Sequence, residues 1–335
     1  MASIFLEDVL EQPKAMRDLL SQKKELEKKA VLLKHEKVLF LGMGASYYAS
    51  SYAAIYLRSN GIDVQCRELS EFIWYDSEKL LEQYDLIVLV SQSGETAELT
   101  RFIDIFSKKL DNCVLVTNNP SCFNAQILGE SRVFPIFAGT ERAMGSSKTF
   151  LNTIVTLLIT ASTWTGQNLD FERLIDHVES TLTTNADSFT RDLLDKANLI
   201  FVGRGFSVPI LRMAQLTLAE ISKVNSVVYS GAGFRHGPME LMVTNPLVGV
   251  VALQGKTMAL SLDLLSDLSS YQNIWCITDQ DLSIEKSIVL KQGLCETLSS
   301  IPVMVLFQKV ANDLSIIRGY EPGVGIIASK VTKKE

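Results

Sequence analysis

The chain has 335 residues, of which 47% are hydrophobic and 21% charged. This composition is typical of a globular protein with enough length for two domains. The net charge of −6 argues against a protein that binds nucleic acid through a broadly basic surface. Anionic small molecules are not excluded, because a local pocket of backbone N–H groups can outweigh the overall charge.

The five cysteines, at 66, 113, 122, 276 and 295, form no CxxC pair. We interpret them as free thiols of a reducing compartment, with no disulfide and no metal site, and we expect no cofactor. The N-terminus lacks the basic and apolar regions of a signal peptide, and the longest apolar run, Ile154 to Trp164, is too short to span a bilayer. These features predict a cytoplasmic protein without a membrane partner.

The first half of the chain alternates apolar runs with helical patterns. Residues 6–35 have near-helical spacing of leucines with a break near Pro13. The runs that follow are bounded by turn residues and predict strands at 38–41, 86–90, 114–117 and 133–136. Strands that alternate with helices indicate βαβ units and a mainly parallel sheet with helices on both faces.

The second half repeats the pattern of the first. Residues 199–205 resemble 38–44, residues 247–257 resemble the strand and turn around Ser91, and residues 274–279 resemble 114–118. An internal repeat of this kind predicts two tandem α/β domains. We divide the chain into a helical segment, a first domain, a second domain and a tail, at 1–35, 36–165, 190–320 and 321–335.

Two glycine- and hydroxyl-containing turns follow strands of the first domain. They are Gly42-Met43-Gly44-Ala45-Ser46 and Ser91-Gln92-Ser93-Gly94-Glu95-Thr96. Ligands of an open parallel sheet bind at the carboxyl ends of its strands, where helix N-termini favour anions. For one such turn, a simple helix cap is about as good an explanation, but two at equivalent strand ends favour a phosphate site. No P-loop lysine follows, and Tyr47 replaces the third glycine of the dinucleotide fingerprint, so a small phosphorylated molecule fits better than a nucleotide.

Three further features are not assigned a function by residue type alone. The loop 138–149, with Met144 and Ser146, precedes an apolar helix and on its own indicates only a cap with a lysine. Glu220 lies in an apolar helical pattern, where a glutamate is either solvated or a partly buried general base. His236 lies in a turn before Gly237-Pro238 and has no assigned role from residue type alone, whereas His35 and His177 lie in charged surroundings and are expected at the surface.

Taken together, these motifs resemble the double sugar isomerase (SIS) domain family. The resemblance is strongest to the isomerase half of glucosamine-6-phosphate synthase and to standalone deaminase and deglycase relatives. It covers residues 38–332 in consistent order. Its motifs are Gly44-Ala45-Ser46, Ser-Gln-Ser-Gly-Glu-Thr at 91–96, Ala138-Gly139-Thr140-Glu141 with Ser146-Ser147-Lys148, Gly203-Arg204-Gly205, Glu220-Ile221, His236-Gly237-Pro238 and Ser329-Lys330-Val331-Thr332.

The resemblance implies two flavodoxin-like, doubly wound parallel domains and assigns roles to individual residues. Glu220 would move a proton between C1 and C2 of the sugar, His236 would assist ring opening from the other subunit of a homodimer, and Lys330 would approach the carbonyl carbon. The sugar phosphate would be held by the substrate-binding residues Ala45, Ser46, Ser91, Gln92, Ser93, Thr96, Met144 and Ser146.

The sequence also departs from the synthase. Ala2 stands where the synthase has the cysteine of its glutaminase domain, Thr217 replaces a lysine three residues before the catalytic glutamate, and Ala45 replaces a threonine. We therefore expect chemistry with ammonia or water, and predict an amino-sugar phosphate deaminase that converts glucosamine 6-phosphate to fructose 6-phosphate. The alternatives are a deglycase of fructosyl-amino acid 6-phosphates, a phospho-aldose/ketose isomerase, and a non-catalytic phosphosugar-binding regulator.

Overall fold

The computed structural model of the chain describes residues 2–33, 35–76, 78–327, 329–330 and 332. Its contacts divide the chain into two interleaved units, each containing one sheet. The first-sheet unit comprises Lys14–Glu141, Ser146–Phe171 and Gly325–Glu335. The second-sheet unit comprises Met1–Pro13, Arg142–Gly145 and Glu172–Val324. The chain thus passes more than once between the two units.

The segment predicted as interrupted helix forms α1 (Ile4–Leu10), α2 (Gln12–Ser21) and α3 (Lys23–Val31). The break predicted near Pro13 is confirmed, since α2 begins one residue before it. Proline is tolerated in the first turn of a helix because the N–H groups there have no partner within the helix.

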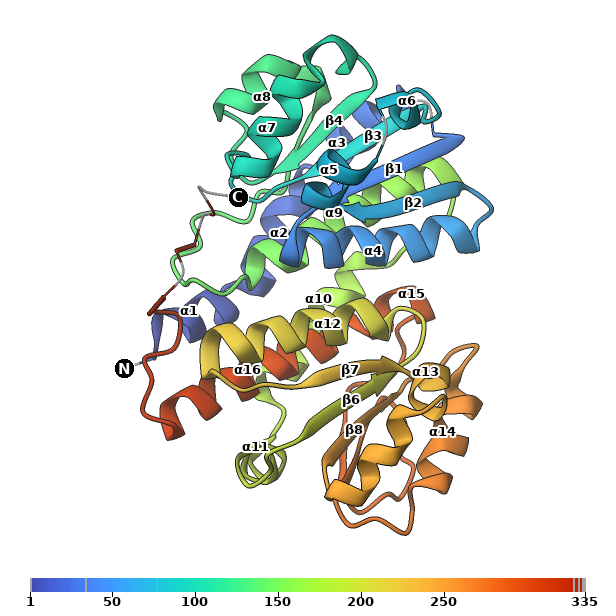
Figure 1. Cartoon of the computed structure of the whole chain (residues 1–335), viewed down its shortest axis with the longest axis vertical. Coiled ribbons are helices and arrows are strands. Elements are labelled where there is room, and N and C mark those ends of the chain that lie inside the picture. Colours follow the sequence, from blue (N-terminus) through green and yellow to red (C-terminus); the bar gives the residue numbers. More distant parts are fainter. Residues whose placement is uncertain (1, 34, 77, 328, 331, 333–335) are drawn as a thin grey trace. The chain divides into compact units, whose positions relative to one another are not determined.

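The first sheet has five parallel strands in the order β2-β1-β3-β4-β5. Its helices cover both faces (Figure 1), as the sequence predicted. The strands are β1 (Lys37–Gly42), β2 (Asp63–Glu68), β3 (Leu86–Val90), β4 (Cys113–Thr117) and β5 (Val133–Pro135). The helices are α4 (Gly44–Ser59), α5 (Leu69–Tyr75), α6 (Glu78–Leu81), α7 (Ala97–Ile105), η1 (Ser107–Lys109), α8 (Phe123–Leu128), η2 (Glu130–Arg132) and α9 (Lys148–Thr165).

The central strands of the first sheet are buried on both faces. Leu39 and Leu89 point to a core that contains Phe72 of α5 and Phe102 of α7. On the opposite face, Phe40 and the alternate valines of β3 and β4 line a small space with Leu157 of α9. Strands buried on both sides read as continuous apolar runs, which is why the sequence identified them.

The second sheet has the order β10-β9-β8-β6-β7, which is the same order when its strands are renumbered from β6. Its strands are β6 (Leu199–Gly203), β7 (Val227–Ser230), β8 (Leu247–Ala252), β9 (Ile274–Thr278) and β10 (Ser287–Val289). Its helices are α10 (Phe171–Thr183), α11 (Asp187–Leu194), α12 (Ser207–Thr217), the π-helix η3 (Leu218–Ser222), α13 (Gly231–Arg235), η4 (Pro238–Thr244), α14 (Met258–Asp267), α15 (Glu296–Ser299) and α16 (Ile301–Ile317). The prediction of two tandem, doubly wound parallel domains is confirmed.

The second sheet also has a core on each face. Phe201 of β6 packs edge-on against Phe307 of α16, with ring centroids 4.9 Å apart. On the other face, Val202 and Val250 pack in a cluster with Phe234 and Leu264. Among the described residues, one stretch, Glu296–Ile317, is long and apolar enough to cross a membrane by composition, but 78% of its most apolar window is buried within the structure.

One expectation about the exposure of the histidines is wrong. His177 was expected at the surface, but it is 1% exposed. Its Nδ1 lies 2.7 Å from the carbonyl oxygen of Arg173, and its Nε2 lies 3.0 Å from that of Gln292. The charged neighbours of His177 in the sequence occupy the other face of α10, so local composition was a poor guide to the burial of this side chain.

Candidate functional site

The two hydroxyl-containing turns of the first-sheet unit lie at the same edge of the sheet. Gly42 at the end of β1 pairs with Val90 at the end of β3, so the residues that follow both strands are neighbours. β1 and β3 are also the strands at which the order β2-β1-β3 reverses direction. Ligands of doubly wound sheets bind in the crevice at such a reversal. The position of the turns therefore favours a binding site.

The turn after β3 is held in one conformation by its own hydroxyl groups and by its neighbours. Ser91 is 5% exposed, and its Oγ accepts from Gly94 N at 3.2 Å. Ser93 Oγ accepts from Glu95 N at 3.2 Å, and Asn124 Nδ2 donates to the Gly94 carbonyl at 2.8 Å. Both serines act here as acceptors within the turn, so their hydroxyl protons can still be donated to a ligand.

Gly94 is required in this turn for two reasons. Its φ is +67°, a left-handed conformation that favours glycine. A Cβ atom built on Gly94 would also overlap the sulfur of Cys122. The turn is therefore close-packed against the loop after β4, and a side chain at this position would have to displace it.

Two of the predicted binding hydroxyls have no hydrogen bond within the part of the chain that the structure describes. Thr96 is the N-cap of α7 but makes no capping bond through its side chain. Ser46, in the first turn of α4, is half-buried and likewise has no side-chain partner there. A helix cap alone does not explain these residues, since capping uses the side-chain oxygen. Ala45 and Gln92 lie in the same turns and are half-buried.

The C-terminal tail passes over this edge of the first sheet. The first backbone N–H of α7, on Ala97, donates to the Thr332 carbonyl at 3.2 Å. Two residues earlier in the tail, Lys330 Nζ donates to the backbone carbonyl of Glu141 at 2.7 Å and lies 3.2 Å from its carboxylate Oε2. The structure thus brings Lys330 into the same unit as the Ser91–Thr96 turn.

Glu141, which the sequence analysis placed in the Ala138–Glu141 motif without a role of its own, is buried. Its side chain is 1% exposed, and Oε1 accepts from the backbone N–H groups of Ser147 and Thr149 at 2.8 and 3.0 Å. These N–H groups belong to the start of α9, where a carboxylate is favoured by the helix dipole. Ser146, a predicted substrate contact, pairs through Oγ with Thr149 Oγ1 at 2.7 Å. The available signals were the Ala138–Glu141 motif and the position of this glutamate seven residues before the apolar helix α9.

The remaining predicted site residues belong to the second-sheet unit. Met144 donates its backbone N–H to the Gly323 carbonyl at 2.8 Å. His236 follows α13 as its C-cap and is exposed. Glu220 is half-buried, and its segment Leu218–Ser222 is a π-helix and not the regular helix that the sequence pattern predicted. Single π-turns inside helices are rare and occur frequently at functional sites.

Lys223 ends the π-turn that carries Glu220. Its backbone is left-handed, with φ of 56°, and its Nζ donates to the Glu220 carbonyl at 2.6 Å. Burial lowers the pKa of Lys223, and the negative charge of Glu220 acts in the opposite direction. Three residues before Glu220, Thr217 is fully buried, and its hydroxyl has no hydrogen-bond partner among the described residues. Among these residues, no group of three His, Cys, Asp or Glu side chains is placed to hold a metal ion.

Comparison with known proteins finds a family match within the first-sheet unit. Residues 31–161 match the SIS domain family. The chain is 26% identical over 336 residues to glutamine–fructose-6-phosphate aminotransferase (isomerizing) of Pyrococcus horikoshii, which covers 95% of this chain and 55% of that protein. The chain therefore spans about half the length of this curated relative.

Solved structures share the fold of the whole chain. Tagatose-6-phosphate ketose/aldose isomerase from Escherichia coli superposes with a TM-score of 0.81 at 18% identity, covering 97% of this chain and 96% of that one. Glucosamine-6-phosphate deaminase from Thermotoga maritima gives a TM-score of 0.72 at 20% identity, covering 96% and 100%. At these identities the likeness establishes the fold.

Proposed function

We propose that this chain, which carries a SIS domain and is homologous to the isomerase domains of glutamine–fructose-6-phosphate aminotransferases, is an amino-sugar phosphate deaminase. Its reaction would convert glucosamine 6-phosphate and water to fructose 6-phosphate and ammonia. The observation that carries the proposal is the Ser91–Thr96 turn at the strand reversal of the first sheet, with the Lys330–Glu141 pair in the same unit.

We assign binding of the phosphate group to the turns after β1 and β3. Ser46 and Thr96 supply hydroxyls without a partner in the described structure, and Ser91 and Ser93 supply protons that the turn itself does not use. The N-termini of α4 and α7 add a favourable dipole for an anion. Binding the phosphate provides energy away from the reacting carbons and orients them.

Glu220 is assigned the proton transfer. Once the sugar ring is open, C1 is an aldehyde and the C2 proton is acidified by it. Glu220 would remove this proton from C2 and return it to C1, which yields a 2-imino ketose that water hydrolyses to the ketose and ammonia. General-base catalysis of this kind contributes about 10²–10⁴-fold. The half-buried position of Glu220 in a π-turn is suited to a carboxylate that must be both positioned and accessible.

Lys330 and His236 are assigned supporting steps. In its pair with Glu141, Lys330 is an ammonium that can donate to the oxygen that becomes negative as the C2 proton leaves. His236 is exposed, and an imidazole can transfer the ring-oxygen proton near neutral pH. An exposed catalytic histidine agrees with a site shared between the two chains of a homodimer, and a cytoplasmic location is part of the same proposal.

The proposal is tested by supplying the purified protein with glucosamine 6-phosphate and, in parallel, with a fructosyl-amino acid 6-phosphate. Ammonia, free amino acid and hexose phosphate are measured. Release of ammonia and fructose 6-phosphate from the first substrate is expected. Release of amino acid from the second would instead identify a deglycase, interconversion of hexose phosphates without nitrogen release an isomerase, and binding without turnover a regulator.

The role of Glu220 is tested by Glu220→Gln, which keeps the shape of the side chain and removes the base. We expect kcat to fall at least 100-fold, in line with the contribution of a general base. The matched control is Glu172→Gln, because Glu172 is an exposed glutamate of the same unit. Full activity in Glu220→Gln would show that the proton transfer is carried out by another group.

A further inference from the structure

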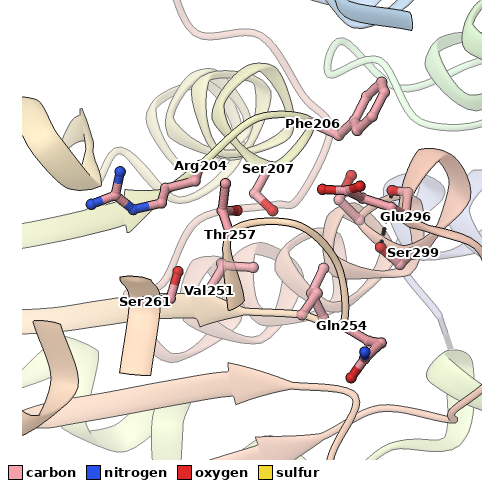
Figure 2. Close-up of a pocket in the computed structure, with 11 residues that line it drawn as sticks. Arg204, Phe206, Ser207, Val251, Gln254, Thr257, Ser261, Glu296 and Ser299 are labelled. Carbon is pink, nitrogen blue, oxygen red and sulfur yellow. Dashed lines mark hydrogen bonds between the residues drawn. The ribbon is translucent and has the colours of Figure 1, made fainter. Parts of the chain in front are cut away.

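The second-sheet unit has two segments that bear on the proposed reaction. The π-turn η3 carries Glu220, and Arg142–Gly145 carries Met144, a predicted substrate contact. The pocket at the carboxyl ends of β6 and β8 (Figure 2) has a volume of about 20 Å³, which holds about one water molecule and not a sugar phosphate. The contribution of this unit to the reaction therefore depends on how the two segments are positioned.

Asp8 of α1 binds the backbone of the segment Arg142–Gly145. Its side chain is 0% exposed, and Oδ2 accepts from the backbone N–H groups of Arg142 and Ala143, each at 2.8 Å. Hydrogen bonds to a carboxylate are shorter and stronger than those between neutral groups. The guanidinium of Arg142 adds an ion pair, with its Nε 3.8 Å from Asp8 Oδ1. A buried carboxylate held in this way fixes the segment relative to α1.

The helix that carries Asp8 is anchored to the core of the same unit. Ser3, the N-cap of α1, donates through Oγ to Asn312 Oδ1 of α16 at 2.6 Å. Phe5 and Val9 of α1 are fully buried. Asp8 therefore holds the segment from a helix that is itself packed in the core.

The same segment lies against the π-turn that carries Glu220. Gly145 is buried, and a Cβ atom built on it would lie 2.6 Å from Cδ1 of Ile221. Its φ is not left-handed, so the close approach, and not the backbone conformation, requires glycine here. Ile221 follows Glu220 directly, is fully buried, and its carbonyl accepts from Ser315 Oγ of α16 at 2.8 Å. A shift of Arg142–Gly145 would therefore displace the neighbour of the proposed base.

We propose that Asp8 is a positioning residue of the reaction, which holds Arg142–Gly145 against the π-turn through two backbone hydrogen bonds. The contact of Gly145 with Ile221 then keeps Met144 and Glu220 in a fixed arrangement. The inference rests on the proposed function, because it requires that Glu220 transfers the proton. A misplacement of about 1 Å caused far from the chemistry can lower a rate about 100-fold. Asp8 can therefore control the reaction without touching the substrate.

The first test compares Asp8→Asn with Asp8→Leu by backbone hydrogen exchange and by turnover of glucosamine 6-phosphate. Asparagine keeps an oxygen that accepts from both N–H groups, whereas leucine fills a similar volume without an acceptor. In Asp8→Leu, exchange at 142–145 and at 218–222 should be faster by about fivefold or more, and kcat should fall about tenfold or more. Asp8→Asn should stay within about threefold of the original protein in both measurements.

The matched control is Glu7→Gln. Glu7 lies beside Asp8 on α1 and contacts the same arginine, Arg142, at 2.7 Å, but only through partly exposed side chains. Exchange and kcat should both be unchanged in this variant, because surface ion pairs contribute little.

A second set of variants tests the contact at Gly145 without leaving a buried group unpaired. Gly145→Ala adds a methyl group that Ile221 must avoid, so kcat should fall about tenfold. Ile221→Val removes the overlapping Cδ1 atom, so the double variant should recover about threefold or more of this loss. A merely structural role predicts no recovery, because Ile221→Val by itself removes buried contacts and should lower Tm.

The outcomes separate this inference from the proposed function. Faster exchange at 142–145 in Asp8→Leu with unchanged exchange at 218–222 would overturn the link to the π-turn, with the proposed function still standing. Equal kcat in Asp8→Asn and Asp8→Leu would overturn the role of the two hydrogen bonds. If Asp8→Leu does not fold, a double variant at Gly145 and Ile221 that fails to recover activity overturns the inference. If the original protein shows no turnover, the proposed function fails, and the exchange measurement still decides whether Asp8 couples the segment to the π-turn.

Discussion

The pair formed by Lys330 and Glu141 leads to a quantitative prediction. In Glu141→Gln, the amide oxygen can replace Oε1 and keep the N–H groups of Ser147 and Thr149. The amide nitrogen then replaces Oε2, which accepts from Thr149 Oγ1 at 2.7 Å and lies 3.2 Å from Lys330 Nζ. The threonine hydroxyl can rotate to accept from the new amide, but the ammonium of Lys330 can only donate. The variant therefore removes the lysine contact selectively.

The expected cost follows from burial. Removing one member of a buried ion pair costs about 3–5 kcal/mol, and a hydrogen bond to a charged group contributes about 1.5–3 kcal/mol. The Glu141 side chain is 1% exposed, but that of Lys330 is 27% exposed and retains its bond to the Glu141 carbonyl. We therefore use the smaller range, about 1.5–3 kcal/mol. With an unfolding entropy of about 2.1 cal/mol/K per residue, a chain of 335 residues should show a fall in Tm of about 2–4 °C.

The assay combines thermal unfolding with kinetics of glucosamine 6-phosphate turnover. Glu141→Gln, Lys330→Met and the double variant form a mutant cycle, with Glu172→Gln as the exposed control. Because the two side chains touch, the effects on Tm should be less than additive in the double variant. As a positioning residue for Lys330, Glu141 should affect kcat about tenfold or more, while KM changes by less than about twofold.

Two results would refute this reasoning. If Glu141→Gln had the Tm of Glu172→Gln, the buried contact would not stabilise the fold. If Glu141→Gln and Lys330→Met were additive in both Tm and kcat, the two residues would act independently. In that case Glu141 would serve only the start of α9, and Lys330 would be positioned by the tail alone.

Three further outcomes are expected. Gly94→Ala should weaken phosphosugar binding at least fivefold, whereas Gly61→Ala, which has φ of +85° but no atom near its Cβ, should affect only stability, as binding and melting measurements can show. Burial acts to raise the pKa of Asp192, but hydrogen bonds from Lys286 and Trp275 outweigh it and leave the pKa below its usual range. The stabilisation from this pair is therefore present above the ordinary aspartate pKa near 4 and is lost as pH falls below it. Asp192→Asn should reduce the fall in unfolding free energy at acid pH by less than about 1 kcal/mol, because both side chains of the pair are about one-third exposed. Cys295 is exposed and should react first with a thiol reagent under native conditions, as peptide mass spectrometry can show.

Much of the fold could be predicted from local sequence. The central strands are buried on both faces, so each appears in the sequence as an unbroken apolar run. The helix break near Pro13 follows from proline itself, which has no backbone N–H and disrupts a helix interior. The repeat of this pattern predicted two parallel domains, and the two sheets have the same strand order. The turns at Ser46 and Ser91–Thr96 were found because glycine and hydroxyl residues follow these strands directly.

The strands that sequence analysis missed are all at sheet edges. β2 and β7 contain exposed or half-buried residues at most positions, and β10 has only three residues. Edge strands bury one side at most, so their hydrophobic signal is weak. The π-turn at Glu220 was also not predictable, because its sequence continues the apolar spacing of α12. One contact of this turn comes from far along the chain, since the Ile221 carbonyl accepts from Ser315 Oγ of α16.

The sequence by itself determined which residue types stand at the ends of the strands, because that chemistry is local. The tertiary structure decided their partners. Glu141 and Lys330 are 189 residues apart, and only folding brings a tail lysine to a carboxylate at the start of α9. The same holds for a small pocket in the second-sheet unit, where Ser207, Thr257 and Ser300 stand at the starts of three different helices. Contacts between residues so distant in the chain depend on packing of whole elements, which no local pattern encodes.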